Sequence, residues 1–92
     1  MTTTRTAFVD IVRDGDSFNS SPDGEVRLVN VCAPERGHPS YATAKRQLEE
    51  LILRKNVRLL RHGRDSFGRL LADVYVGAIH VNEAQRRNGW RC

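Results

Sequence analysis

The order of strand-like and helix-like segments along the chain restricts the fold most strongly. Short apolar segments rich in β-branched residues are typical of strands, and turn residues separate such segments here. We expect strands over residues 6–12, 16–20, 25–32, 56–61 and 70–76, with a short extended piece at 79–81. One long amphipathic stretch lies between the third strand and the fourth. Because the strands stand in groups on either side of one helix, the pattern favours a small antiparallel barrel over a parallel sheet.

The amphipathic stretch predicts one long helix that begins at Pro39-Ser40 and ends at about Lys55. Its apolar side chains recur at the spacing of one helix face, namely Tyr41, Ala44, Leu48, Leu51 and Ile52. A short helix follows the last strand. We expect Asn82 to cap its start together with Gln85, and Gly89 to end it.

These elements predict a mainly β fold with helices (α+β), namely a five-stranded OB-type barrel with one long helix and a short C-terminal helix. Helix 40–55 is expected to close one end of the barrel. Asp14-Gly15 is read as the turn between the first two strands, because glycine adopts positive φ without steric cost. A chain of 92 residues supplies one small core. We therefore expect a single domain over residues 1–92, with residues 1–5 disordered.

The charge of the chain favours a polyanionic partner. Lys and Arg number 15 against 11 Asp and Glu, which gives a formal net charge of +4. Basic proteins of this kind include nucleic-acid-binding domains, although many other small proteins carry a similar charge. No segment is long and apolar enough to span a membrane, so no membrane partner is expected.

The two cysteines, Cys32 and Cys92, are read as free thiols, which fits a reducing compartment. Cys32 is either a thiol made reactive by nearby basic residues or, as we prefer, a half-buried small residue at a strand end. The opening residues 1–6 lack the apolar stretch of a secretory signal. The chain as it stands is therefore read as cytoplasmic, and the compartment of the natural protein stays open.

Four motifs occur in order along the chain. They are Asp14-Gly15-Asp16-Ser17, then Val26-Arg27-Leu28 leading to Ala33-Pro34-Glu35, then Asp65-Ser66-Phe67-Gly68-Arg69, and finally Val81-Asn82-Glu83-Ala84. Together they closely resemble the staphylococcal-nuclease-like (thermonuclease) family over residues 6–90. The resemblance implies an OB barrel and a calcium-dependent phosphodiesterase (endonuclease) that cleaves DNA or RNA, with single-stranded nucleic acid favoured as the partner.

The resemblance also implies a role for each of four residues. Asp16 resembles a calcium ligand, Arg27 and Arg69 resemble the paired catalytic arginines, and Glu35 resembles the carboxylate that activates water. These roles agree with the chemistry, because attack of water on a phosphodiester spreads negative charge over oxygens that planar guanidinium groups match with two donors each. A hard cation bound by carboxylate oxygens polarises the phosphate further.

This chemistry depends on the fold. Eight residues of straight strand would place Arg27 roughly 26 Å from Glu35, too far apart to share one phosphate. We expect a strongly coiled strand, ended by a turn at Pro34, to bring the two side chains together.

Three departures from the family pattern qualify the functional expectation. Cys32 stands where the family carries an Asp ligand of calcium, and a thiol is a poor partner for a hard cation. Ser66 and Phe67 stand where the family has a Lys and a Tyr that help to hold a phosphate. The family commonly continues beyond Cys92 into a third helix, so an open apolar surface is expected, and either a homodimer or an exchanged segment is a candidate to cover it. The alternative function is therefore a nuclease-like OB domain that binds nucleic acid or protein without efficient catalysis.

The remaining candidate residues favour structural roles. His38, His62 and His80 fall in different elements without the spacing of metal ligands, so no metal or catalytic role is expected for them. Tyr41 and Trp90 fit core packing better than base stacking, and Phe67 is left open between the two roles.

Overall fold

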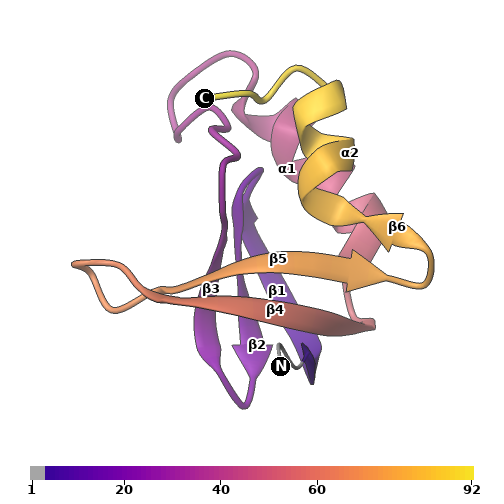
Figure 1. The fold of residues 1–92 in the computed structure, drawn as a ribbon. Helices are drawn as coiled ribbons and strands as arrows, with labels where there is room; N and C mark the ends of the chain where they lie inside the picture. The colour runs from indigo at the N-terminus through magenta and orange to yellow at the C-terminus, as the bar shows by residue number, and fades with distance from the viewer. Residues whose placement is uncertain (1–3) are drawn as a thin grey trace.

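Five strands wrap into a closed barrel, and two helices lie next to each other against it (Figure 1). The computed structural model describes residues 4–92. The strands are β1 (Thr4–Asp14), β2 (Ser17–Ser21), β3 (Gly24–Leu28), β4 (Asn56–Arg64), β5 (Leu70–Val76) and β6 (Ile79–His80), and the helices are α1 (Tyr41–Ile52) and α2 (Val81–Arg87). This confirms the predicted α+β architecture of a five-stranded OB-type barrel with one long and one short helix.

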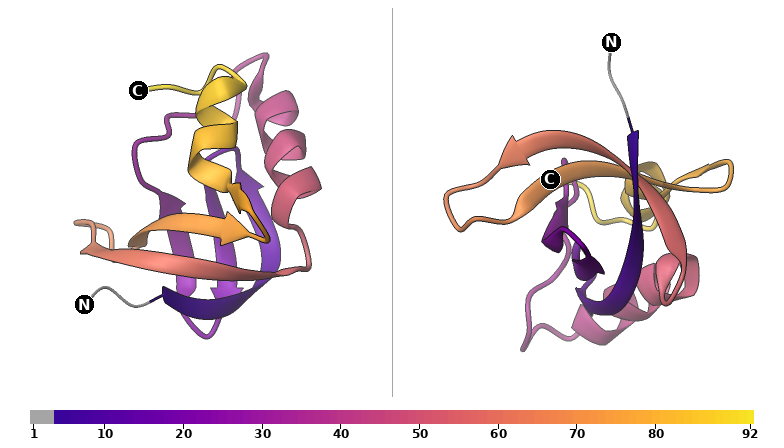
Figure 2. Two further views of the ribbon diagram at one scale, coloured as in Figure 1. Left: turned by 45° about the vertical axis from the view of Figure 1, so that its right-hand side comes forward. Right: turned by 90° about the horizontal axis from the view of Figure 1, so that it is seen from below.

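Closure of the barrel uses one parallel strand pair. The strands are hydrogen-bonded in the order β3-β2-β1-β4-β5-β6, and β3 also pairs with β5 (Figure 2). The long strand β1 pairs with β4 through its first half and with β2 through its second half. The β3–β5 pair is parallel, so the prediction of an antiparallel barrel is wrong at this seam. The connection through α1 and β4 lets the chain return to β5 in the direction of β3.

Two strands extend further than predicted. β1 begins at Thr4, which pairs with Leu60, so the predicted disorder is wrong for Thr4 and Arg5. The first three residues of that prediction lie outside the described residues. β4 continues past Arg61 to Arg64, because its hairpin with β5 extends across an irregularity in the register.

The long helix ends three residues earlier than predicted. It stops at Ile52 rather than Lys55, and Arg54 adopts a left-handed φ of 58°. The backbone of this segment pairs with β1 instead, since Arg54 N–H donates to the Val9 carbonyl and Val9 N–H donates to the Lys55 carbonyl. Hydrogen bonds to the sheet thus replace the last helical turn.

The core contains side chains from all five barrel strands, from both helices and from the segment after β3. Its buried members are Ala7, Val9, Val12, Phe18, Val26, Leu28, Val31, Leu48, Ile52, Val57, Leu59, Leu70, Ala72, Val74 and Val81. Trp90 packs against this cluster, as predicted from its pattern.

Asn82 and Gln85 do not form the predicted helix cap, because the helix begins at Val81, one residue before Asn82; both side chains are fully buried. The start of α2 has no side-chain capping hydrogen bond. Asn82 instead accepts a hydrogen bond from Val74 N–H at 2.8 Å and donates to the carbonyls of Val29 and Ala72. These bonds tie α2 to β5 and to the chain that leaves β3.

Gly15 is required by a close approach rather than by its backbone angle. A Cβ atom at this position would lie 2.6 Å from the Cβ of Ala44 and 2.7 Å from the Cβ of Ala33. Gly15 is not among the glycines with positive φ, so the sequence-based reason given for it is wrong. Its carbonyl accepts a hydrogen bond of 2.7 Å from Gln85 Nε2. The β1–β2 turn is thereby fixed between both helices and the segment after β3.

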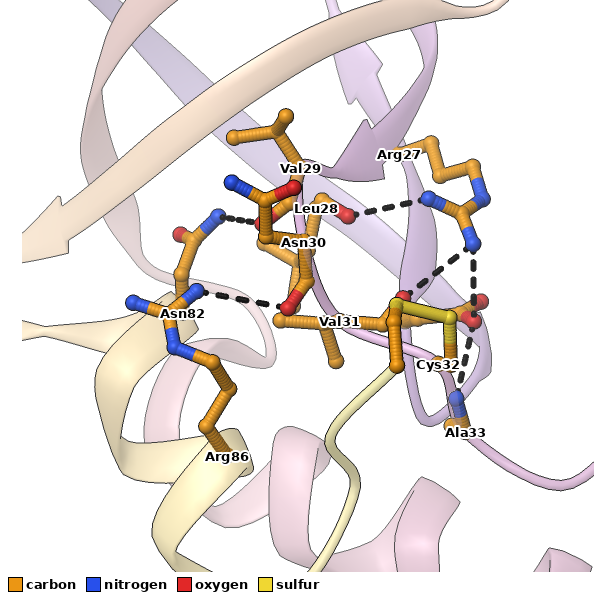
Figure 3. The surroundings of a disulfide bond; sticks show 11 residues. Arg27, Leu28, Val29, Asn30, Val31, Cys32, Ala33, Asn82 and Arg86 are labelled. Carbon is orange, nitrogen blue, oxygen red and sulfur yellow. Dashed lines mark hydrogen bonds and ion pairs between the residues drawn. A yellow bond between two sulfur atoms is a disulfide. The ribbon is translucent and has the colours of Figure 1, made fainter.

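A disulfide joins Cys32 to Cys92, which overturns the prediction of two free thiols and with it the argument for a reducing compartment (Figure 3). The fold brings the two positions together, because Cys32 N–H donates to the Trp90 carbonyl at 3.0 Å. The Cα atoms of the two cysteines are 4.8 Å apart, within the usual range for a disulfide. The sequence carries no local signal of this contact.

Reduction of the disulfide is expected to destabilise the protein. The two cysteines are 60 residues apart, and releasing a loop of that length lowers stability by about 4 kcal/mol in the chain-entropy model. Urea denaturation with and without a thiol reductant measures this change. The double variant Cys32→Ser/Cys92→Ser should show the same loss and no further response to reductant. Equal stability of the oxidised and reduced proteins would contradict the expectation.

Gly15→Ala is expected to destabilise the protein by about 1–3 kcal/mol, the usual cost of an added group in a packed site. The new methyl group meets two Cβ atoms that cannot rotate away. The control is Thr43→Ala, which also introduces an alanine but on the exposed face of α1. Urea denaturation of both variants provides the comparison. Equal midpoints would contradict the expectation, because they would show that the β1–β2 turn can move away from Ala44 and Ala33 with little loss of stability.

Candidate functional site

The parallel pairing of β3 with β5 brings the two predicted arginines to one end of the barrel. Val26 is in register with Leu70, so the residues that precede them, Glu25 and Arg69, are neighbours. Arg69 Nη1 lies 4.0 Å from Glu25 Oε2. Arg27 follows on the same strand, and Arg27 and Arg69 line one pocket.

Arg27 holds the turn that ends β3. Its Nη1 donates to the Leu28 carbonyl at 3.2 Å and its Nη2 donates to the Val31 carbonyl at 3.1 Å (Figure 3). The strand ends at Leu28 instead of residue 32, because Asn30 adopts a left-handed φ of 59° that redirects the chain. The predicted turn at Pro34 therefore occurs several residues earlier.

Asp16 lies in the β1–β2 turn and faces the segment after β3. Its Oδ2 accepts a hydrogen bond from Ala33 N–H at 3.0 Å and lies 3.6 Å from Arg27 Nη2. Burial raises the pKa of Asp16 to about 7, and the neighbouring Asp14 carboxyl adds to the rise. The hydrogen bond from Ala33 and the charge of Arg27 oppose that rise only in part.

Asp14 is a second carboxylate of the same turn, and it was read from sequence only as a turn residue. Its Oδ1 accepts hydrogen bonds from Asp16 N–H at 3.2 Å and from Ser17 Oγ at 2.7 Å. Burial acts to raise the pKa of Asp14, but hydrogen bonds from Asp16 and Ser17 outweigh it and leave the pKa below its ordinary value. Asp14 and Asp16 therefore form a close acidic pair that favours a shared proton or a cation.

Glu35 is exposed at the mouth of the pocket. Its backbone carbonyl accepts a hydrogen bond from His38 N–H at 3.0 Å, and this bond fixes the turn that follows Glu35. Within residues 4–92, the Glu35 carboxylate forms no hydrogen bond or ion pair with another side chain, so it is free to contact a water molecule or a ligand.

The four residues singled out from the sequence line one pocket of about 270 Å³. The pocket is lined by Asp14, Asp16, Arg27, Cys32, Ala33, Glu35 and Arg69. Arg27 and Glu35, which a straight strand would keep far apart, thus share one cavity. Cys32 lines this pocket as one half of a disulfide and not as a free thiol.

Arg69 is held in place by Asp65, a contact that sequence reasoning did not assign. Arg69 Nε lies 2.8 Å from Asp65 Oδ2, and the backbone N–H of Arg69 donates to Asp65 Oδ1 at 2.9 Å. This leaves the outer edge of the guanidinium for the pocket. The spacing Asp65-x-x-x-Arg69 within one turn was the available signal.

The pocket suits a hard cation when water and substrate supply some of its ligands. Asp14 and Asp16 offer carboxylate oxygens, the ligand type that calcium prefers. In the described part of the chain, no three His, Cys, Asp or Glu side chains are placed to hold a metal ion by themselves. The acidic pair, with the raised pKa of Asp16, nevertheless favours a positive charge beside it.

A second polar cluster lies outside this pocket and was missed from the sequence. The two carboxylate oxygens of Asp73 form one hydrogen bond each. Oδ2 lies 2.7 Å from His62 Nε2, and Oδ1 lies 2.7 Å from His80 Nε2. The two histidines are 18 positions apart, and the pairing of β5 with its neighbours brings them to one carboxylate. Hydrogen bonds from His80 and His62 overcome the effect of partial burial and lower the pKa of Asp73.

None of the helices among the described residues is long and apolar enough to cross a membrane.

Known proteins are similar to this chain in sequence. Residues 25–90 match the family model described as staphylococcal nuclease homologue. A Haemophilus influenzae protein named an uncharacterized endonuclease is 34% identical over 82 residues, covering 85% of this chain and 46% of the relative. An Escherichia coli O157:H7 protein of the same name is 32% identical over 82 residues, covering 85% of this chain and 54% of the relative.

The chain thus spans about half the length of these two relatives. Arg27, Glu35 and Arg69 lie within the range that matches the family model. The barrel, the order of the motifs and the family match agree with one another. The chain therefore belongs to the staphylococcal nuclease family of hydrolases.

Proposed function

We propose that this protein is an endonuclease that hydrolyses phosphodiester bonds of DNA or RNA with the help of calcium. The observation that carries the proposal is the convergence of Arg27, Arg69 and Glu35 on one pocket from distant parts of the sequence. The family is generally calcium-dependent, and the two curated relatives described above are named endonucleases.

The two arginines bind the phosphate and stabilise charge that develops on its oxygens. Arg27 uses two of its five N–H groups to hold the turn after β3, and its Nη2 also lies 3.6 Å from Asp16 Oδ2, so the remaining N–H groups are the ones that can bind a ligand. Arg69 is fixed through its Nε by Asp65. Because both guanidinium groups are oriented before substrate binds, little reorganisation is needed during reaction.

Glu35 orients the attacking water and accepts its proton. An exposed carboxylate without a partner in the described residues can contact water directly. A carboxylate base within hydrogen-bond reach of the attacking water contributes typically about 10²- to 10⁴-fold in rate.

Asp16 and Asp14 would hold the cation. A bound calcium ion supplies Lewis-acid polarisation of the phosphate and offsets the charge of the acidic pair. The Ala33 N–H and Arg27 already engage one oxygen of Asp16, so the second oxygen and the Asp14 carboxylate are the remaining protein donors.

Glu35→Gln is expected to reduce the cleavage rate by about 10²- to 10⁴-fold, because it removes the proton acceptor. Arg69→Lys is expected to reduce it by about 10²-fold or more, because lysine cannot reproduce two parallel hydrogen bonds to phosphate. Single-turnover cleavage of a labelled oligonucleotide in calcium measures both rates. The control is Glu50→Gln, an exposed carboxylate on α1.

Glu35→Gln and Arg69→Lys should both unfold at the same thermal midpoint as the wild type and the control Glu50→Gln. A loss of rate then reports on the chemical step and not on stability. Full activity of Glu35→Gln or of Arg69→Lys would remove that residue from the mechanism. Arg27 is tested as Arg27→Lys with a parallel stability measurement, because its guanidinium also holds the β3 turn.

A second candidate function is a binding module without efficient catalysis. The observation that favours it is the disulfide at Cys32, which removes this position as a ligand of calcium. Such a protein would bind nucleic acid in the same pocket and cleave it slowly or not at all.

A matched pair of variants separates these functions. Cys32→Asp/Cys92→Ser and Cys32→Ser/Cys92→Ser both lack the disulfide and differ only in one carboxylate. We expect the aspartate variant to bind calcium more tightly by about tenfold or more, since loss of even an indirect ligand contact commonly costs that much. Calorimetric titration with calcium measures the difference, and equal affinities would show that position 32 does not face the ion.

Cleavage by the same proteins, in calcium and in chelator, completes the test. Wild-type cleavage that stops with chelator supports the endonuclease. Binding without cleavage in the wild type, with activity only in the aspartate variant, supports the module.

A further inference from the structure

β4 and the two residues before it carry a large share of the positive charge of the protein. Five of the 15 Lys and Arg residues lie in residues 54–64, and none of the 11 Asp and Glu residues does. The rest of the chain therefore holds 10 basic against 11 acidic side chains. The five basic residues are all exposed, and together they form what we call the β4 basic surface: Arg54, Lys55, Arg58, Arg61 and Arg64.

No carboxylate neutralises this surface. Within residues 4–92, none of its five side chains forms an ion pair, whereas arginines elsewhere in the fold do so, as Arg5 does. Two acidic residues beside β4 are engaged by other groups, since Asp73 on β5 bonds two histidines and Asp65 bonds Arg69. The positive charge of the β4 basic surface is thus open to an external anion.

Uncharged groups hold two of these arginines in place. Arg58 Nη2 donates to the Gly77 carbonyl at 2.9 Å, and the Arg58 Cζ atom lies 5.4 Å from the centroid of the Tyr75 ring. Arg64 Nη1 donates to the Gly68 carbonyl at 2.9 Å. A guanidinium group has five N–H donors, so each arginine keeps most of its donors for a ligand. Because the two side chains are positioned before a ligand binds, less conformational entropy is lost on binding.

The β4 basic surface is long and narrow. β4 crosses the barrel and ends in a hairpin that projects from it (Figure 1). Arg58 and Arg64 are six positions apart, which corresponds to roughly 20 Å along a strand. Each strand of a B-form duplex carries one phosphate per roughly 3.4 Å of helix axis, so about six phosphates of one strand match that length.

One end of this surface lies beside the candidate site. The Gly68 carbonyl, which binds Arg64, directly precedes Arg69 in the chain. Arg69 lines the pocket of the candidate site. A nucleic acid that lies along β4 therefore continues next to that pocket.

The composition of the surface favours nucleic acid over an anionic lipid surface. Four of its five cations are arginines, whose planar guanidinium groups match two oxygens of one phosphate. A protein face that lies on a membrane typically inserts apolar side chains beside its cations. The large hydrophobic residues exposed in the described chain are Ile11, Phe67 and Ile79, and none of them lies in residues 54–64.

We propose that the β4 basic surface is a docking site for the phosphate backbone of nucleic acid, and that it anchors a part of the molecule that does not enter the pocket of Arg27, Glu35 and Arg69. This inference goes beyond the proposed function, because the binding needs neither calcium nor the chemistry of the pocket. Contacts to phosphates carry no sequence information, so the surface accepts any base sequence.

The test measures oligonucleotide binding in chelator, so that no calcium-dependent cleavage occurs. The test variant is Lys55→Gln/Arg61→Gln, because these two side chains form no hydrogen bond or ion pair within the described residues. The control is Arg46→Gln/Arg87→Gln, which removes the same charge from exposed positions of α1 and α2. Both variants should keep the wild-type thermal midpoint, since exposed ion pairs contribute little to stability.

We expect Lys55→Gln/Arg61→Gln to weaken binding about tenfold at low salt, and to lower the slope of log affinity against log salt concentration by about one for each residue. The loss should be equal for two oligonucleotides of unrelated sequence. The control Arg46→Gln/Arg87→Gln should bind almost like the wild type.

Three results would overturn the proposal. An equal loss in both double variants would show that only net charge matters. An unchanged salt slope in Lys55→Gln/Arg61→Gln would show that these side chains bind no phosphate. Phosphatidylserine vesicles that bind the wild type more tightly than this variant, while both proteins bind oligonucleotides equally, would assign the surface to a membrane instead.

The outcome is separable from that of the catalytic proposal. Glu35→Gln should bind oligonucleotides in chelator like the wild type, because Glu35 is not part of the β4 basic surface. Absence of cleavage by the wild type in calcium would refute the endonuclease but leave the docking site intact. Cleavage by a protein whose binding does not depend on Lys55 and Arg61 would do the reverse.

Discussion

Gly15 is the point at which four segments of this small protein touch. Its missing side chain lets the β1–β2 turn approach Ala44 of α1 and Ala33 of the segment after β3, and its carbonyl binds Gln85 of α2. The carboxylates on either side of Gly15 therefore face the segment that carries Glu35. The packing around Gly15 therefore also sets the geometry of the candidate site. Any movement at this contact would shift the acidic pair, Asp14 and Asp16, relative to the two arginines of the pocket.

Much of the barrel could be predicted from the sequence, because its strands are short, β-branched and separated by turn residues. β5 was predicted with its observed bounds, and the order of strands and helices was also predicted. The errors lie where tertiary contacts override local pattern. The helix was extended to Lys55, but pairing with Val9 ends it at Ile52. Asn82 fits a helix cap by spacing, and burial against three backbone groups gives it another role.

The candidate site could be predicted only through family motifs, since no local pattern places Arg27 near Arg69. Their proximity comes from a parallel strand pair that was not predicted. The turn at Asn30 was hidden because the residues around it are apolar and read as one continuous strand. Asp14 was assigned to a turn because Asp-Gly is typical of turns, although its carboxylate lines the pocket. The disulfide could not be predicted because the contact of Cys32 with the chain near Trp90 exists only in the folded barrel.

The bond between Cys32 and Cys92 closes a covalent ring that contains α1, β4, β5, β6 and α2. A protease that nicked an exposed turn inside this ring, such as the one around Phe67, would leave both fragments attached to each other. Because the disulfide would hold the two fragments close to each other, the nicked molecule would keep the folded barrel. Limited proteolysis would then yield two smaller fragments only after the disulfide is reduced.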